Sequence, residues 1–419
     1  NTATLSASST AICVGENGTV TVSGLADGVY TITYNLAAPN AATGLTGSVT
    51  ISGGTGTLTV PAASLTATTA SQSVTITSVE DANGCAPATT LSTSTSFAIN
   101  GLPNTATLSA SSTAICVGEN GIVTVSGLAD GVYTITYNLA APNAATGLTG
   151  SVTISGGTGT LTIPAASLTA TTASQSVTIT SVEDANGCAP ASALNISTSF
   201  AINGLPNTAT LSASSTAICV GENGTVTVSG LADGVYTITY NLAAPNAATG
   251  LTGSVTISGG TGTLTIPAAS LTATTASQSV TITSVEDANG CAPATTLSTS
   301  TSFAINGLPN TATLSASAAA ICVGENGTVT VNGLADGVYT ITYNLAAPNA
   351  ATGLTGSVTI SGGTGTLTVP AASLTASTAS QSVTITSVED ANGCAPAITL
   401  STSTSFAING LPNTATLSA

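Results

Sequence analysis

The chain contains no lysine, arginine or histidine, and it also lacks methionine and tryptophan. Without an imidazole, amine or guanidinium group, it cannot assemble a Ser/His/Asp triad, a Schiff base or the lysine of a phosphate-binding loop. Most catalytic classes are therefore excluded. We assign no catalytic residue and expect a protein that is not an enzyme.

Positive side-chain charge is absent, whereas sixteen aspartates and glutamates give a formal net charge of -16. Such a surface repels nucleic acid and anionic lipid, and it attracts divalent cations. We expect no nucleic-acid partner. The missing lysine also rules out Lys–Asn cross-links, and the missing lysine and arginine leave no site for a trypsin-like protease.

Long hydrophobic runs are absent too. No stretch approaches the roughly 18 apolar residues of a membrane span, and no charged and apolar leader opens the chain. We therefore expect a mature fragment without membrane insertion. Because 42% of the residues are hydrophobic, the chain is expected to fold and not to remain disordered.

What the sequence does contain is a near-literal repeat of 103 residues. The segment NTATLSAS begins at Asn1, Asn104, Asn207 and Asn310, and NTATLSA returns at Asn413. A unit of this length suits a small autonomous domain and not a stacked solenoid module. The predicted repeats are 1–103, 104–206, 207–309 and 310–412, with the start of a fifth repeat at 413–419.

Within a repeat, β-branched residues alternate strictly with polar ones, which indicates half-buried strands. The expected strands of the first repeat are 2–6, 19–23, 29–35, 48–52, 57–60, 73–79 and 95–99. The residues expected to face inward are Val20, Val22, Ile32, Tyr34, Val49, Ile51, Leu58, Val60, Val74 and Ile76. Seven or more short strands predict an all-β tandem array of immunoglobulin-like β-sandwich domains, with a small barrel as the alternative.

Each repeat has two cysteines, always 72 residues apart. They are Cys13 and Cys85, Cys116 and Cys188, Cys219 and Cys291, and Cys322 and Cys394. We predict a disulfide inside each repeat, which would stabilise it by roughly 4 kcal/mol and implies an oxidising compartment. The alternatives are free thiols and bridges between repeats, such as Cys85 to Cys116.

An intra-repeat bridge makes a demand on the topology. Cys13 precedes the strand at 19–23 and Cys85 follows the strand at 73–79. Five alternating strands would leave the two cysteines at opposite ends of the sandwich, roughly 20 Å or more apart, whereas bonded Cα atoms lie within about 7 Å. One more traverse is needed, and we predict that residues 61–71 run the length of the sandwich.

The same bridge would gather carboxylates at one end of the repeat. It would draw Glu16 toward Glu80, Asp81 and Asn83, which together form a candidate calcium site. The spacing does not match an EF-hand loop. In the alternative interpretation these residues are ordinary solvated turns, and no cofactor is bound.

The sequence Val79–Cys85 resembles the V-x-DANGC signature of repeats in giant cell-surface adhesins of gliding bacteria. Residues 11–25 and 28–34 resemble the same repeats, and the resemblance covers all four units. It implies a filament on the bacterial cell surface that is exported by type IX secretion. The implied partners are neighbouring repeats and the outer-membrane secretion or gliding-motility machinery.

These observations predict an extended stalk that presents an adhesive tip outside the cell. The competing hypothesis is a self-assembling extracellular filament or surface layer, which uncharged threonine faces would favour. A carbohydrate-binding module would need exposed aromatic platforms, but the first repeat offers only Tyr30, Tyr34 and Phe97.

Overall fold

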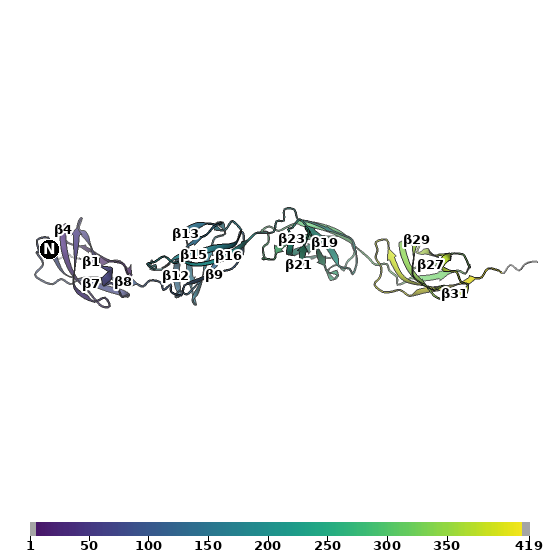
Figure 1. Ribbon diagram of the computed structural model, residues 1–419, viewed down its shortest axis with the longest axis horizontal. Coiled ribbons are helices and arrows are strands. Elements are labelled where there is room, and N and C mark those ends of the chain that lie inside the picture. Colours follow the sequence, from purple (N-terminus) through teal and green to yellow (C-terminus); the bar gives the residue numbers. More distant parts are fainter. Residues whose placement is uncertain (1–5, 413–419) are drawn as a thin grey trace, which may run out of the picture. The chain divides into compact units, whose positions relative to one another are not determined.

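The computed structural model describes residues 6–412, and strands make up most of each repeat (Figure 1). The first repeat contains β1 (Ser6–Ser9), β2 (Ile12–Cys13), β3 (Gly18–Ser23), β4 (Gly28–Leu36), β5 (Ala42–Ile51), β6 (Thr55–Val60), the 3-10 turn η1 (Ala62–Ser64), β7 (Thr69–Asp81) and β8 (Thr93–Asn100). Of the expected strand at 2–6, residues 2–5 lie outside the described part.

The other three repeats contain the same elements in the same order. The second has β9 (Ser109–Ser112), β10 (Ile115–Cys116), β11 (Gly121–Ser126), β12 (Gly131–Leu139), β13 (Ala145–Ile154), β14 (Thr158–Ile163), η2 (Ala165–Ser167), β15 (Thr172–Asp184) and β16 (Ile196–Asn203). The third has β17 (Ser212–Ser215), β18 (Ile218–Cys219), β19 (Gly224–Ser229), β20 (Gly234–Leu242), β21 (Ala248–Ile257), β22 (Thr261–Ile266), η3 (Ala268–Ser270), β23 (Thr275–Asp287) and β24 (Thr299–Asn306). The fourth has β25 (Ser315–Ala318), β26 (Ile321–Cys322), β27 (Gly327–Asn332), β28 (Gly337–Leu345), β29 (Ala351–Ile360), β30 (Thr364–Val369), η4 (Ala371–Ser373), β31 (Thr378–Asp390) and β32 (Thr402–Asn409). Within residues 6–412 no helix is long and apolar enough to cross a membrane.

Each repeat is a sandwich of a three-stranded and a five-stranded sheet. In the first repeat the strand orders are β1-β3-β6 and β2-β8-β7-β4-β5. All the pairings are antiparallel except the short parallel pair of β2 with β8, where Cys13 lies opposite Asn100. The first strand is thus divided between the two sheets, as β1 and β2. The chain is therefore an all-β tandem array of immunoglobulin-like sandwiches.

Alternation in the strands produces the core, because successive side chains of a strand point to opposite faces. All ten residues predicted to face inward are buried, with no more than 1% of each side chain exposed. The threonines between them on β3 and β6, such as Thr19 and Thr59, are exposed. The sequence prediction of the core is confirmed.

Each repeat has its own hydrophobic core. The four clusters of buried hydrophobic residues lie within residues 12–99, 108–202, 218–305 and 329–408. The chain divides into two compact units, with the boundary in the sequence between Gly204 and Leu205, and each unit holds two cores. The repeat boundaries at every 103 residues stay a prediction from the sequence.

The predicted traverse at residues 61–71 is wrong. Val60 at the end of β6 lies opposite Gly18, and Thr69 at the start of β7 lies opposite Ile99. Gly18 and Ile99 both belong to the end of the sandwich that holds Cys13. The segment between β6 and β7 therefore crosses from one sheet to the other at that end, through η1, and β7 alone runs back toward Cys85.

A buried polar network holds this crossing in place. Gln72 is fully buried, and it accepts a hydrogen bond from Asn40 (2.8 Å) and donates one to the carbonyl of Ala37 (2.9 Å). Asn40 also exchanges two hydrogen bonds with the backbone of Ala67 (2.7 and 2.8 Å). Because every amide group of the pair has a partner, burying them costs little and specifies the path of the chain.

Candidate functional site: the disulfide junctions

The first cysteine of a repeat lies on a short loop held by backbone hydrogen bonds. The amide of Cys13 donates to Glu16 Oε2 (2.9 Å), and the amide of Glu16 donates back to the carbonyl of Cys13 (3.1 Å). Val14 donates to the carbonyl of Asn100 (2.8 Å), the last residue of β8. Cys13 is therefore fixed beside the point where the chain leaves the repeat.

The second cysteine ends the DANGC loop at the opposite end of the sandwich. Asp81 Oδ1 accepts hydrogen bonds from the amides of Asn83 and Cys85, both at 2.9 Å, and the Asp81 amide donates to the carbonyl of Cys85 (3.1 Å). Gly84 adopts φ +79°, which L side chains rarely reach. The hydrogen bonds from Cys85 and Asn83 lower the pKa of Asp81, because they stabilise the ionised carboxylate.

The disulfides join different repeats. Cys13 of the first repeat is bonded to Cys188 of the second, and Cys219 of the third is bonded to Cys394 of the fourth. The Cα atoms are 5.5 and 5.6 Å apart, and each pair is separated by 175 residues in sequence. Each bridge therefore connects the exit end of one repeat to the DANGC loop of the next.

Of the remaining cysteines, Cys116 and Cys291 are also disulfide-bonded, whereas Cys85 and Cys322 are free and exposed. The predicted Cys13–Cys85 bridge is wrong, and so is the alternative from Cys85 to Cys116. The physical reason is the strand count. Five strands do leave Cys13 and Cys85 at opposite ends of the sandwich, and no extra traverse brings them together.

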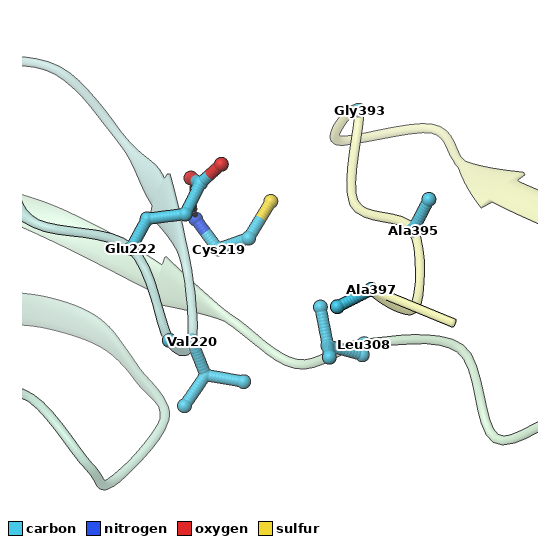
Figure 2. A pocket seen from close by; sticks show the side chains of 8 residues that line it. Cys219, Val220, Glu222, Leu308, Gly393, Ala395 and Ala397 are labelled. Atoms are coloured by element: carbon cyan, nitrogen blue, oxygen red, sulfur yellow. Dashed lines mark hydrogen bonds between the residues drawn. The ribbon is translucent and has the colours of Figure 1, made fainter. Parts of the chain in front are cut away.

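In both of these bridges the cysteine of the DANGC loop is buried. Cys188 and Cys394 are fully buried. Between the third and fourth repeats a cleft of about 450 Å³ is lined by Cys219 and Glu222 on one side and by Gly393 and Ala395 on the other, with Leu308 beside Ala397 (Figure 2). Apart from Cys219 and Glu222, the lining residues are glycine and apolar side chains, which suits close approach of two repeats.

The calcium ligands expected from the intra-repeat bridge are not gathered. Within residues 6–412, no group of three or more His, Cys, Asp or Glu residues is placed to hold a metal ion. Glu16 and Asp81 each use a carboxylate oxygen on nearby backbone amides, and Asn83 belongs to the loop that Asp81 closes. Glu80 is exposed. Since Cys13 and Cys85 are at opposite ends, Glu16 is not drawn toward Glu80, Asp81 and Asn83.

The aromatic side chains do not form an exposed platform. Tyr34 and Phe97 are buried in the core, with 1% and 4% of their surfaces exposed. Burial raises the pKa of Tyr34. Tyr30 is partly buried, and its hydroxyl donates to the carbonyl of Ala26 (3.0 Å). The first repeat therefore presents no flat aromatic surface of the kind on which sugar rings stack.

No known family pattern matches the chain, and no curated protein matches it. Among solved structures, the tetra-tandem repeat in the extending region of a large adhesion protein is 15% identical, with a TM-score of 0.26, over 97% of this chain and 99% of that one. The I-band fragment I67-I69 of titin is 11% identical, with a TM-score of 0.29, over 73% of this chain and 98% of that one. At these scores, the fold assignment depends on the sheet topology described above.

Proposed function

We propose that this chain is an extending segment of a secreted adhesin, a stalk of immunoglobulin-like repeats stapled to one another by disulfides. The observation that carries the proposal is the pairing of Cys13 with Cys188 and of Cys219 with Cys394. A bond inside a domain protects that domain alone, whereas a bond between successive domains also resists their separation. Disulfides are typical of proteins outside the reducing cytosol.

The pairing shortens the covalent path along which a pulling force travels. From Cys13 the path passes through the disulfide to Cys188, then along the chain to Cys219, and through the second disulfide to Cys394. Residues 14–187 and 220–393 lie outside this path. At about 3.5 Å per residue, the stretch from Cys188 to Cys219 extends to only about 110 Å. Such an arrangement suits a spacer that must keep its length under tension.

The bacterial cell surface, type IX secretion and a role in gliding motility belong to the same proposal. Their support is the resemblance of Val79–Cys85 and its equivalents to the repeats of giant adhesins. The absence of lysine and arginine adds to it, because trypsin-like proteases outside the cell find no site in the chain.

A second candidate function is lateral assembly into an extracellular filament or surface layer. It is favoured by the outer face of the three-stranded sheet, where Thr19 lies opposite Thr59 and Thr21 lies opposite Thr57. All four threonines are exposed and no charge separates them. Uncharged faces of this kind lack the charged residues that keep sheets apart.

Light scattering and small-angle X-ray scattering of the purified chain separate the two functions. A stalk segment stays monomeric across concentration, and at roughly 40 Å per sandwich its maximum dimension is about 160 Å. Growth of the particle mass with concentration under reducing conditions would support assembly through the sheets. A monomer that is compact, with a dimension far below 160 Å, would contradict the stalk.

A further inference from the structure

The first strand of each repeat, which is β1, β9, β17 or β25, contributes little to the core. In the fourth repeat, Ala316 and Ala318 are the residues of β25 that pack against the buried cluster, and both are only partly buried. Backbone pairs join β25 to β27, from Ser315 opposite Asn332 to Ala318 opposite Val329. Local opening costs least where few apolar contacts are lost, so a strand of this kind can leave its sheet while the core stays closed.

In the first three repeats, serine side chains fasten this strand to both sheets. Ser9 at the end of β1 donates a hydrogen bond to the carbonyl of Ser96 on β8 (3.0 Å), and its hydroxyl is also bonded to that of Thr95 (3.1 Å). At the start of β1, the hydroxyls of Ser6 and of Ser23 on β3 lie 2.6 Å apart. The equivalent bonds in the second and third repeats are between 2.7 and 3.2 Å long. Side chains therefore fix the strand at both of its ends.

The fourth repeat lacks these fastenings. Ala318 occupies the place of Ser9, and an alanine has no hydroxyl to donate to β32. Asn332 occupies the place of Ser23, opposite Ser315. In the described part of this repeat, no side-chain hydrogen bond joins Ser315 or Ala318 to a neighbouring strand. The backbone register of β25 on β27 is the same as that of β1 on β3, so the difference lies in the side chains. Alanine and asparagine are in addition depleted in strands.

We propose that β25 is a releasable strand, which detaches from its sandwich more readily than the first strands of the other three repeats. The inference does not depend on the stalk function. Release breaks the pairing with β27, while the buried cluster within residues 329–408 stays closed. Because β25 lies between Cys219 and Cys394, which are joined by a disulfide, its release does not lengthen the covalent path of force described above. The fourth repeat thus opens locally and keeps its core.

Hydrogen exchange of the four-repeat chain, followed by pepsin digestion and mass spectrometry, tests the proposal. Reductant is present throughout, so that no repeat is held by a disulfide. Peptides that cover β25 are identified by Ala318 and Ala319, whereas those that cover β1, β9 and β17 share one sequence and are measured together. We expect the amides of residues 315–318 to exchange about tenfold faster than those of the other first strands, a difference of about 1.4 kcal/mol.

A restored variant tests whether the missing side chains are the cause. Ala318→Ser with Asn332→Ser rebuilds the side chains of the other repeats, and exchange of residues 315–318 should slow to the rate of the other first strands. The reciprocal change in the third repeat, Ser215→Ala with Ser229→Asn, should speed the exchange of β17 by the same factor. Both variants carry residues that already occur at these positions in folded repeats of the chain.

The last strand of the repeat provides the control. Ile398 distinguishes peptides that extend into β32 from those of the other repeats, and their amides should exchange at the same rate as those of β8 and β24. Equal exchange of β25 and the other first strands would overturn the proposal. Fast exchange of β32 as well would also overturn it, because the whole fourth repeat would then be less stable. A restored variant that still exchanges fast would show that the serines are not responsible.

Discussion

The DANGC loops of the first and second repeats have the same local structure but different bonding. In the second repeat, the Cys188 amide donates to Asp184 Oδ1 (2.9 Å) and the Asp184 amide donates to the Cys188 carbonyl (3.0 Å), as in the loop of Cys85. Yet Cys188 is bonded and buried, whereas Cys85 is free and exposed. The disulfide therefore does not build the loop. Local hydrogen bonds build it, and the disulfide links a finished repeat to its neighbour.

The largest expected effect is on the length of the chain under force. With the bridges intact, Cys13 and Cys394 are connected through the segment from Cys188 to Cys219, whose contour is about 110 Å. After reduction the same two cysteines are connected by the whole intervening chain, about 1,300 Å. Atomic force microscopy with and without reductant measures the difference. The oxidised double variant Cys13→Ser and Cys219→Ser should stretch well beyond the bridged chain, and full extension of the oxidised native chain would contradict the bonding.

The second prediction compares one repeat with two. Residues 1–103 contain Cys13 and Cys85 but no bridge between them, so reduction should change the free energy of unfolding by less than about 0.5 kcal/mol. Residues 1–206 contain the bridge from Cys13 to Cys188. Reduction should lower their free energy of unfolding by up to about 5 kcal/mol, on the chain-entropy estimate for a loop of this size. Urea denaturation measures both. If reductant destabilises the single repeat instead, the result would contradict the bonding between repeats and support a disulfide between Cys13 and Cys85.

The third prediction concerns the core, where the two repeats should respond alike. Gln72→Leu removes the acceptor of one Asn40 hydrogen bond and the donor to the Ala37 carbonyl, and it should cost about 1–3 kcal/mol of unfolding free energy. Gln175→Leu in the second repeat breaks the same contact, in which Asn143 donates to Gln175 Oε1 at 2.9 Å. The two variants should lose similar stability in urea denaturation, with or without reductant. A loss confined to the oxidised chain would tie the network to the junction instead.

The fourth prediction concerns the loop carboxylate of the first repeat. The pKa of Asp81 is lowered by hydrogen bonds from Cys85 and Asn83 in the folded state, so its stabilising effect is present above the unfolded value near pH 4 and is lost as the pH falls through the folded value. Asp81→Asn should therefore lower the melting temperature of residues 1–103 near neutral pH, and the difference should vanish in acid. A difference that persists unchanged at pH 2 would contradict this account.

The smallest expected effect is that of calcium. Since Glu16 and Asp81 are engaged with backbone amides, adding calcium or a chelator should not change the melting temperature of the four-repeat chain. Differential scanning calorimetry in matched buffers measures this. A rise of several degrees with calcium alone would contradict this account.

Much of the fold could be predicted from local sequence. Alternation identified the inward residues of β3, β4, β5, β6 and β7, because a period of two places every second side chain in the core. Glycines at turns marked most of the breaks between strands. The buried Gln72 and its partner Asn40 were missed, since a polar side chain in a core has no local signature until its partner is known.

The candidate site was predicted only in part. Cysteine number and spacing indicated disulfides, and six of the eight cysteines do form them. The error was in the choice of partner. The strand count correctly placed Cys13 and Cys85 at opposite ends, but a traverse at residues 61–71 was then assumed to rescue the intra-repeat bond. A cysteine at each end of a repeated unit can equally bond the next unit, and near-identical repeats hide which copy is the partner.

By itself, the sequence determined the all-β class and the alternating core, because these follow from composition and from a period of two along each strand. Only the tertiary structure decided which cysteines bond. That choice depends on which ends of the sandwiches meet, and therefore on the short crossing between β6 and β7 that leaves Cys13 and Cys85 on opposite sides of the repeat.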